Sequence, residues 1–179
     1  YRVTTNTTVF NGVDEEDVIE MFEMVTEWGV EGVMVSPGYQ FETIPNQDLF
    51  ISRKNARKVF KNILKPERNI RFYNNPLYLD FLRGETEYQC TAWSNPTYTV
   101  MGWREPCYLL GDRHTQDVND LYSDAIWEKY GVGKDLRCAN CMMHCGFESA
   151  SIFSAMSSPK AAFKLIKEGA MQNSGIGAG

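Results

Sequence analysis

Five cysteines, all in the second half of the chain, are the residues whose type and spacing favour inorganic chemistry. Cys90 and Cys107 stand apart, whereas Cys138, Cys141 and Cys145 follow one another closely in the run Cys-Ala-Asn-Cys-Met-Met-His-Cys. A Cys-x-x-Cys pair allows two thiolates to face one metal while backbone amides point at the sulfurs. In a reducing compartment, such clustering indicates metal or redox chemistry before disulfides.

Two inorganic groups fit this spacing. Four thiolates bind a structural zinc ion in a tetrahedron, and four thiolates also hold a [4Fe-4S] cluster. The spacing leaves the choice open, and the fifth cysteine is then an alternative ligand, a spare thiol or a neighbour of the bound group. His114 and His144 are the two histidines, so a histidine-rich catalytic metal site is excluded, and Ser/His/Asp or Cys/His hydrolase chemistry has little to draw on.

A hairpin is expected to bring two of the sulfurs together. Alternating β-formers occupy residues 97–100 and are followed by Gly102, and residues 107–110 are expected to pair back on them. A hairpin of this length would place the sulfurs of Cys90 and Cys107 near each other.

A helix is predicted between the hairpin and the Cys-x-x-Cys pair, from about residue 115 to residue 129. Its expected buried side consists of Val118, Leu121, Tyr122, Ala125 and Ile126. Further along, Cys145 lies four residues after Cys141, a spacing that would put the two on one face of a helix.

The first part of the chain predicts a different architecture. Residues 2–10 are rich in β-branched side chains and end at a turn, which is typical of a strand. Apolar residues recur at helical spacing from 15 to 28, and residues 32–36 form a short apolar run, as expected of a strand covered on both faces. Strand, helix and buried strand make a βαβ unit, so the fold class is α/β with a parallel sheet or barrel.

Polar side chains stand on or just after these two strands. Ligands of parallel α/β folds collect at the carboxyl ends of the strands, which singles out Asn6 and Thr8 on the first strand and Ser36 and Tyr39 on or after the second. The alternative interpretation is ordinary strand threonine and turn chemistry. The irregular segment 40–52 is long enough to form a loop over the mouth of a barrel.

Three further elements complete the predicted first half. A basic amphipathic helix covers residues 53–65, with a charged side that is expected to face water. Residues 70–73 are a plausible third strand, and residues 76–83 a short helix ended by Gly84.

A last helix is expected after Pro159. Its apolar stripe consists of Ala162, Phe163, Leu165 and Ile166, and Gly169 is expected to end it before a disordered Gly/Ala/Ser run. The ordinary interpretation is a helix docked on the rest of the protein, and peripheral contact with a membrane is the alternative.

Charge and hydropathy limit the function classes. The net charge of -5 makes a broad nucleic-acid-binding surface improbable. No apolar run is long enough for a membrane span and nothing resembles a signal peptide, so a cytoplasmic protein is expected. The chain opens on Tyr1 inside an expected strand, which leads us to expect further sequence upstream.

Several motifs together resemble those of one enzyme family. Cys90, Gly102, Cys107 and the Cys138-x-x-Cys141 pair are similar in pattern to the twitch or SPASM-type extension of radical S-adenosylmethionine (SAM) enzymes. The resemblance extends from Tyr1 to about Ile152 and is closest to the adenosyl-hopene transferase family of bacterial hopanoid biosynthesis. It rests on the motifs TTNTT at 4–8, VSPGY at 35–39, NPTY at 95–98, GW at 102–103, PCYLL at 106–110 and CANCMMHCG at 138–146.

This resemblance implies the C-terminal portion of a (βα)6 radical SAM partial barrel, followed by a small cysteine-rich α+β iron-sulfur extension. The implied divisions are residues 1–84 for the barrel part, 85–156 for the extension and 157–179 for a helix and flexible tail. In such enzymes a 5′-deoxyadenosyl radical is formed from SAM, and in this family it is understood to add to a hopene, diploptene, to give adenosylhopane. A reductant such as flavodoxin or ferredoxin is implied as a partner.

The resemblance also implies functions for individual residues. An auxiliary [4Fe-4S] cluster would be held by Cys90, Cys107, Cys138 and Cys141, with Cys145 as an alternative to Cys141. Asn6 and Ser36 would contact SAM. Tyr39 and Trp103 would face the isoprenoid substrate, although Trp103, like Trp93 and Tyr98, is equally well interpreted as core or hairpin packing. The radical-generating motif CxxxCxxC, which holds a second [4Fe-4S] cluster, is not in this sequence, so the chain alone is expected to be inactive.

Overall fold

The computed structural model describes residue 1, residues 3–41 and residues 44–173, with side chains up to Gly169 in the last helix. Strand β1 (Thr4–Val9) pairs in parallel with β2 (Gly32–Pro37), and helix α1 (Glu15–Glu27) connects them. Asp14 starts α1 by accepting a hydrogen bond from the amide of Glu16, and Gly29, with φ of 83°, follows its end. The predicted βαβ unit is confirmed.

Two further helices also follow the sequence pattern. Ser52 caps α2 (Arg53–Ile63), which buries Ala56, Phe60 and Ile63. Asn75 caps α3 (Pro76–Arg83) and is followed by Pro76 at the first helical position, while Gly84, with φ of 78°, closes the helix in the left-handed conformation.

The predicted third strand is reduced to a single parallel bridge between Val33 and Phe72. In a continued strand, the amide of Val35 would donate to a backbone carbonyl of the third strand. It donates instead to the side-chain oxygen of Asn74 at 2.7 Å. The chain then turns into α3 at Asn75, so the pairing ends after one bridge.

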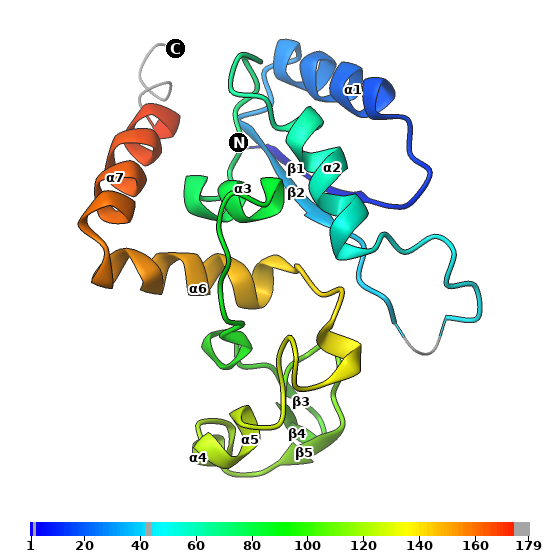
Figure 1. Cartoon of the computed structure of the whole chain (residues 1–179), viewed down its shortest axis with the longest axis vertical. Coiled ribbons are helices and arrows are strands. Elements are labelled where there is room, and N and C mark those ends of the chain that lie inside the picture. Colours follow the sequence, from blue (N-terminus) through cyan, green and yellow to red (C-terminus); the bar gives the residue numbers. More distant parts are fainter. Residues whose placement is uncertain (2, 42–43, 174–179) are drawn as a thin grey trace.

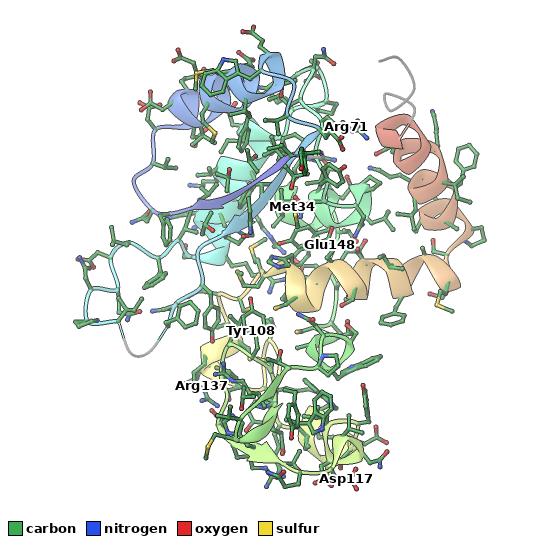
Figure 2. All side chains as sticks on the ribbon, turned by 180° about the vertical axis from the view of Figure 1, so that it is seen from behind. Met34, Arg71, Tyr108, Asp117, Arg137 and Glu148 are labelled. Carbon is green, nitrogen blue, oxygen red and sulfur yellow. The ribbon has the colours of Figure 1, made fainter. Side chains whose placement is uncertain are left out.

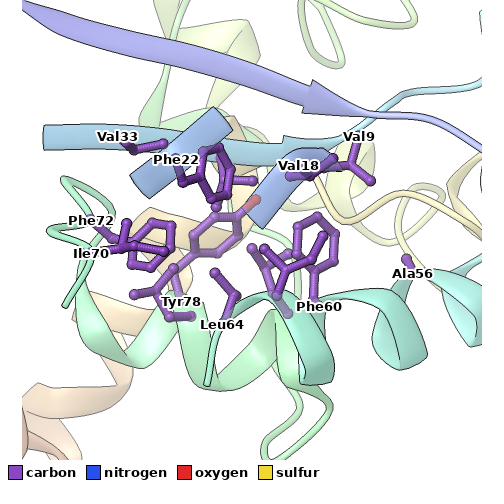
Figure 3. Close-up of a cluster of buried hydrophobic side chains, with 14 of the residues drawn as sticks. Val9, Val18, Phe22, Val33, Ala56, Phe60, Leu64, Ile70, Phe72 and Tyr78 are labelled. Atoms are coloured by element: carbon purple, nitrogen blue, oxygen red, sulfur yellow. The ribbon is translucent and has the colours of Figure 1, made fainter. Parts of the chain in front are cut away.

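The main core lies between the strands and α1, α2 and α3, and Figure 3 shows its centre, where Phe22, Phe60 and Tyr78 meet. Phe22 and Phe60 are fully buried, and Phe22 meets Phe72 edge to face with centroids 5.7 Å apart. Met142 and Phe147, from the cysteine-rich part, belong to the same core. The core therefore continues across the expected division at residue 84.

The cysteine-rich part contains a small antiparallel sheet in the order β3 (Tyr98–Thr99), β4 (Gly102–Glu105), β5 (Arg113–Thr115). The expectation that residues 107–110 pair back on 97–100 is wrong, because β4 is the partner of β3 and residues 108–110 form a turn. Gly102 has a φ of 114°, which favours glycine, and it also lets β4 lie close to β5, since a Cβ there would lie 2.6 Å from the carbonyl oxygen of Thr115. Residues 113–115 then pair with β4.

The single helix predicted over 115–129 is also wrong, and two one-turn helices replace it. Helix α4 (Val118–Leu121) begins at Asp117, and α5 (Asp124–Trp127) begins after Ser123. Thr115 belongs to β5, so the helical run starts late, and Tyr122 ends α4. Leu121 and Ile126 are buried as expected, whereas Tyr122 and Ala125 are exposed.

Two one-turn helices flank the small sheet in the sequence: η1 (Ala92–Ser94) follows Cys90, and η2 (Leu136–Cys138) ends at Cys138. Two long helices then complete the described chain. In Figure 1, α6 (His144–Ser157) runs between the strand-and-helix half and the small sheet, and α7 (Pro159–Asn173) turns back along one side. Both helices contact α3.

The last helix differs from the expectation in two ways. It continues through Gly169 to Asn173, and the expected disordered run after it falls mostly on residues 174–179, outside the described residues. The predicted apolar stripe is divided, because Phe163 and Ile166 are exposed and Ala162 and Leu165 are partly buried. None of the helices in the described residues has the length and apolar character of a membrane span.

Candidate metal centre

All five cysteines line one largely apolar cavity. The lining also includes Tyr39 from the segment after β2, and Leu109, Val132 and Phe147 from the second half. Every cysteine is a free thiol; Cys145 is buried and the other four are partly buried. The structure thus brings together the cysteines that the sequence predicts as a group.

Five different positions in the fold supply these thiols. Cys90 precedes η1, Cys107 follows β4, Cys138 ends η2, Cys141 follows it in the Cys-x-x-Cys pair, and Cys145 lies in the first turn of α6. Cys141 precedes α6, so the expectation that it shares a helical face with Cys145 is wrong. Cys145 approaches the cavity from the helix end instead.

A hydrogen-bond donor faces each sulfur. Backbone amides serve four of them: Ala92 for Cys90, Leu109 and Leu110 for Cys107, Gly131 for Cys138, and Met143 for Cys141. Cys145 is faced by the Tyr108 hydroxyl and the Gly146 amide. Such donors favour the thiolate form that binds metal, and they set the potential of iron-sulfur clusters.

Burial opposes that effect in the metal-free chain. It raises the pKa of the Cys90 thiol to about 12 and that of Cys145 to about 12, with neighbouring cysteines adding to both shifts. Burial likewise raises the pKa of Cys107, Cys138 and Cys141. A ligand set of thiolates therefore requires positive charge in the cavity to replace the protons.

Within the described ranges, no three side chains of the His, Cys, Asp or Glu type are arranged to hold a metal ion directly. The cysteines share a cavity but do not converge on one point. A single zinc ion needs four ligands at about 2.0–2.3 Å from one centre, and the described side chains are not arranged in that way.

Ion pairs hold the segments that carry Cys107 and Cys138 together. The Arg137 side chain donates two hydrogen bonds to Asp112, at 2.7 and 2.8 Å, and two to Asp135, at 3.0 and 2.7 Å. Arg137 lowers the pKa of both carboxyl groups through these hydrogen bonds. A forked pair of this kind fixes direction as well as distance, so it aligns the turn after Cys107 with the residue before Cys138.

Tyr39 was predicted to face substrate, and the structure places it against the cysteines. It is buried, lines the cavity and meets Phe41 edge to face with centroids 5.0 Å apart. Burial raises its pKa, and negative charge on Cys141, Cys107 and Cys138 would raise it further. Tyr39 therefore connects the end of β2 to the cavity.

Asn6 and Ser36 lie on one face of the parallel sheet. The register pairs Asn6 with Met34 and Thr8 with Ser36, and side chains two residues apart share a face. Asn6 is exposed and Ser36 is buried. The opposite face, which includes Val33 and Val35, covers the core.

The aromatic residues of the extension pack with one another. Trp103 meets Tyr98 edge to face at 5.0 Å across β3 and β4, and it is not among the described residues that line the cysteine cavity. Trp93 stacks on Phe153 of α6 at 5.4 Å. The structure thus gives Trp103 a packing function and leaves its predicted contact with substrate untested.

Sequence patterns missed three residues near the site. Tyr108 donates to Cys145, Arg53 reaches from α2 to the Cys-x-x-Cys pair, and Glu148 accepts a hydrogen bond from the amide of Asn75 at 2.8 Å. Figure 2 shows Tyr108 and Arg137 in the cysteine-rich half and Glu148 on the side of α6 nearer the strands. Tyr108 stands in the PCYLL motif beside Cys107, which could have pointed to it, whereas Arg53 and Glu148 stand in none of the motifs and only tertiary structure reveals them.

The fold and the cavity define an α/β unit that carries a cysteine-rich extension. The chain belongs to the family described as Domain of unknown function (DUF3463), whose model matches residues 33–165. The matched stretch runs from β2 into α7 and contains all five cysteines. No curated protein and no solved structure matches the chain. The family description leaves the activity open.

Proposed function

We propose that this chain is the C-terminal part of a radical SAM enzyme and that its cysteine cavity holds an auxiliary [4Fe-4S] cluster. The presence of all five free thiols in the lining of one apolar cavity carries the proposal. Cys90, Cys107, Cys138 and Cys141 are the proposed ligands, and Cys145 is the alternative to Cys141.

The surrounding residues suit this assignment. The amides of Ala92, Leu109 and Met143 stabilise negative charge on the sulfurs, while Tyr39 and Phe147 exclude water. A bound cluster would supply electron transfer, and its binding energy would stabilise the folded extension.

In the full-length enzyme, we propose a transferase that joins the 5′-deoxyadenosyl group of SAM to a hopene in hopanoid biosynthesis. SAM and the second [4Fe-4S] cluster would belong to the complete barrel, and Asn6 and Ser36, which share one face of the parallel sheet, are the proposed contacts of SAM. A flavodoxin or ferredoxin would supply electrons in the cytoplasm, and nucleic acid has no part in this function. The motif resemblance supports this finer assignment.

A second candidate is a metal-stabilised module with a binding function and no catalysis of its own. The free thiols around the cavity would bind a structural metal equally well, and this supports the second candidate. Zinc would serve such a module as well as a cluster would.

Anaerobic reconstitution with iron and sulfide separates the candidates. The proposal expects a brown protein with about four iron and four sulfide per chain, as a [4Fe-4S] cluster requires. A colourless product that retains one zinc would end it. Single Cys→Ser variants at all five positions identify the ligands: Cys107→Ser should lose the iron, and the position whose serine variant keeps it is the spare thiol.

Peripheral contact with a membrane is part of the same proposal. The outward side of α7 carries exposed Phe163 and Ile166 beside exposed Lys160 and Lys167. Apolar side chains flanked by lysines suit a surface of anionic lipid.

A further inference from the structure

Arg53 reaches from the first half of the chain into the cysteine-rich half. It is the first residue of α2, and its amide donates to the side-chain oxygen of Asn140 at 3.2 Å. Its Nη1 donates to the carbonyl oxygen of Cys141 at 3.4 Å, and its Nη2 donates to Glu87 at 2.9 Å. Arg53 thus contacts two residues of the segment that contains the Cys-x-x-Cys pair, Asn140 through its backbone amide and Cys141 through its side chain.

Two aromatic rings fix the position of the Arg53 guanidinium. Its central carbon lies 5.0 Å from the ring centroid of Phe81 and 5.3 Å from that of Phe147. These two rings stack on each other at 4.5 Å and are buried. A planar guanidinium suits such packing while its fork keeps its hydrogen bonds.

The charge of Arg53 acts on the cysteines as well. The Arg53 side chain is 13% exposed, so solvent screens its charge only in part. The cation lowers the pKa of Cys90 against the larger opposing effect of burial, and negative charge on Cys141 in turn favours the charged form of Arg53. Arg53 is therefore a fixed positive charge beside the cavity.

We propose that Arg53 is a positioning residue for the cysteine site, whose fork holds the Cys-x-x-Cys backbone and whose charge stabilises the reduced state of the bound cluster. The first function depends on contacts within the chain alone. The second rests on the proposed cluster, because a positive charge near a cluster favours the state that carries one more electron.

Arg57 provides a matched control. It lies one turn further along α2 and also pairs with Glu87, but none of its described contacts is with the cysteine segment. Arg57→Met therefore removes the same charge and the same acidic partner without touching Cys141. Arg53→Met removes both functions of Arg53, and Arg53→Lys keeps the charge but not the fork.

Hydrogen exchange on the full metal-free chain tests the fork. In both Arg53→Met and Arg53→Lys, amides at 138–145 should exchange about tenfold faster than in the wild type, since a hydrogen bond from a charged donor is lost. Arg57→Met should leave these rates unchanged. Equal rates in the wild type and Arg53→Met would overturn the positioning function, and so would equal acceleration in Arg57→Met.

The midpoint potential of the reconstituted chain tests the charge. Arg53→Met should shift the potential to a more negative value, and Arg53→Lys should restore most of the shift. An unchanged potential in Arg53→Met, or no rescue by lysine, would overturn the charge function. If the wild type binds no cluster, the proposed function fails, and the exchange rates still decide whether Arg53 holds the cysteine segment.

Discussion

The hydroxyl of Tyr78 donates a hydrogen bond of 2.8 Å to the carbonyl oxygen of Met142, the residue that follows Cys141. Tyr78 lies in α3 and is fully buried at the centre of the main core. Burial raises its pKa well above the ordinary value, so the phenol is protonated at neutral pH and can donate this hydrogen bond. The main core therefore holds the cysteine segment through one polar bond.

Removing that bond should destabilise the whole chain. Tyr78→Phe leaves the buried carbonyl of Met142 without its partner, which costs about 1–3 kcal/mol. Urea unfolding measures the change. Tyr73→Phe is the matched control, because the Tyr73 hydroxyl bonds Glu31 at the surface and its loss should cost less than about 0.5 kcal/mol. Equal stability of Tyr78→Phe and the wild type would contradict this account.

Gly146 leaves room for the Cys90 sulfur. A Cβ at Gly146 would lie 2.4 Å from that sulfur, so Gly146→Ala must displace it. We expect a loss of about 1–3 kcal/mol from overpacking, even though alanine by itself favours a helix. In Gly169→Ala, nothing lies within 4 Å of the new Cβ, so this variant should gain roughly 0.5–1 kcal/mol. A stabilised Gly146→Ala chain would show that the contact is unimportant.

Glu148 should give the chain a pH-dependent stability. Burial raises its pKa above the ordinary 4.5, so the folded chain keeps this proton at pH values where the unfolded chain has lost it. Its contribution is fully present below pH 4.5 and is lost as the pH rises through the folded-state pKa. Relative to Glu148→Gln, the wild type should become less stable over this window. Denaturant midpoints of both proteins at several pH values measure the difference, and parallel pH curves would refute the shift.

The outward side of α7 should bind anionic lipid. We expect the chain to sediment with vesicles that contain phosphatidylglycerol and less so with phosphatidylcholine alone, because each lysine near an anionic surface contributes about 1 kcal/mol. Phe163→Asn should reduce binding about tenfold, the amount expected for a lost aromatic contact of about 1.5 kcal/mol. Val100→Asn, at an exposed turn of the small sheet, is the control. Binding unaffected by Phe163→Asn would exclude this face.

Local sequence signals predicted the first half of the fold well. Three helices begin after a capping residue that precedes apolar residues at helical spacing: Asp14, Ser52 and Asn75. Gly84 ends the third of these helices. These devices act over a few residues and depend little on the rest of the chain. The prediction of a third strand was wrong because the side chain of Asn74, which was interpreted as a turn residue, accepts the hydrogen bond from the amide of Val35.

The cysteine-rich half depends on contacts that sequence does not display. The clustering of cysteines predicted one shared site, but the hairpin partner was wrong because residues 102–105 pair with β3 in place of residues 107–110. Arg53 looked like part of a water-facing basic helix, yet its side chain is largely buried on Phe81 and Phe147. Periodicity assigns a side chain to a face and cannot say what covers that face.

The amide and hydroxyl of Thr91 both donate to the carbonyl oxygen of Gly146, each at 3.1 Å. These two hydrogen bonds close a long loop, residues 92–145, which contains the small sheet, α4, α5 and Cys138. The entropy of closing a chain loop grows slowly, by about 0.6 kcal/mol for each doubling of length. Insertions or deletions far from the closing residues should therefore change the closure entropy little. Changes at the closing residues themselves, beside Cys90 and Cys145, would break the loop closure.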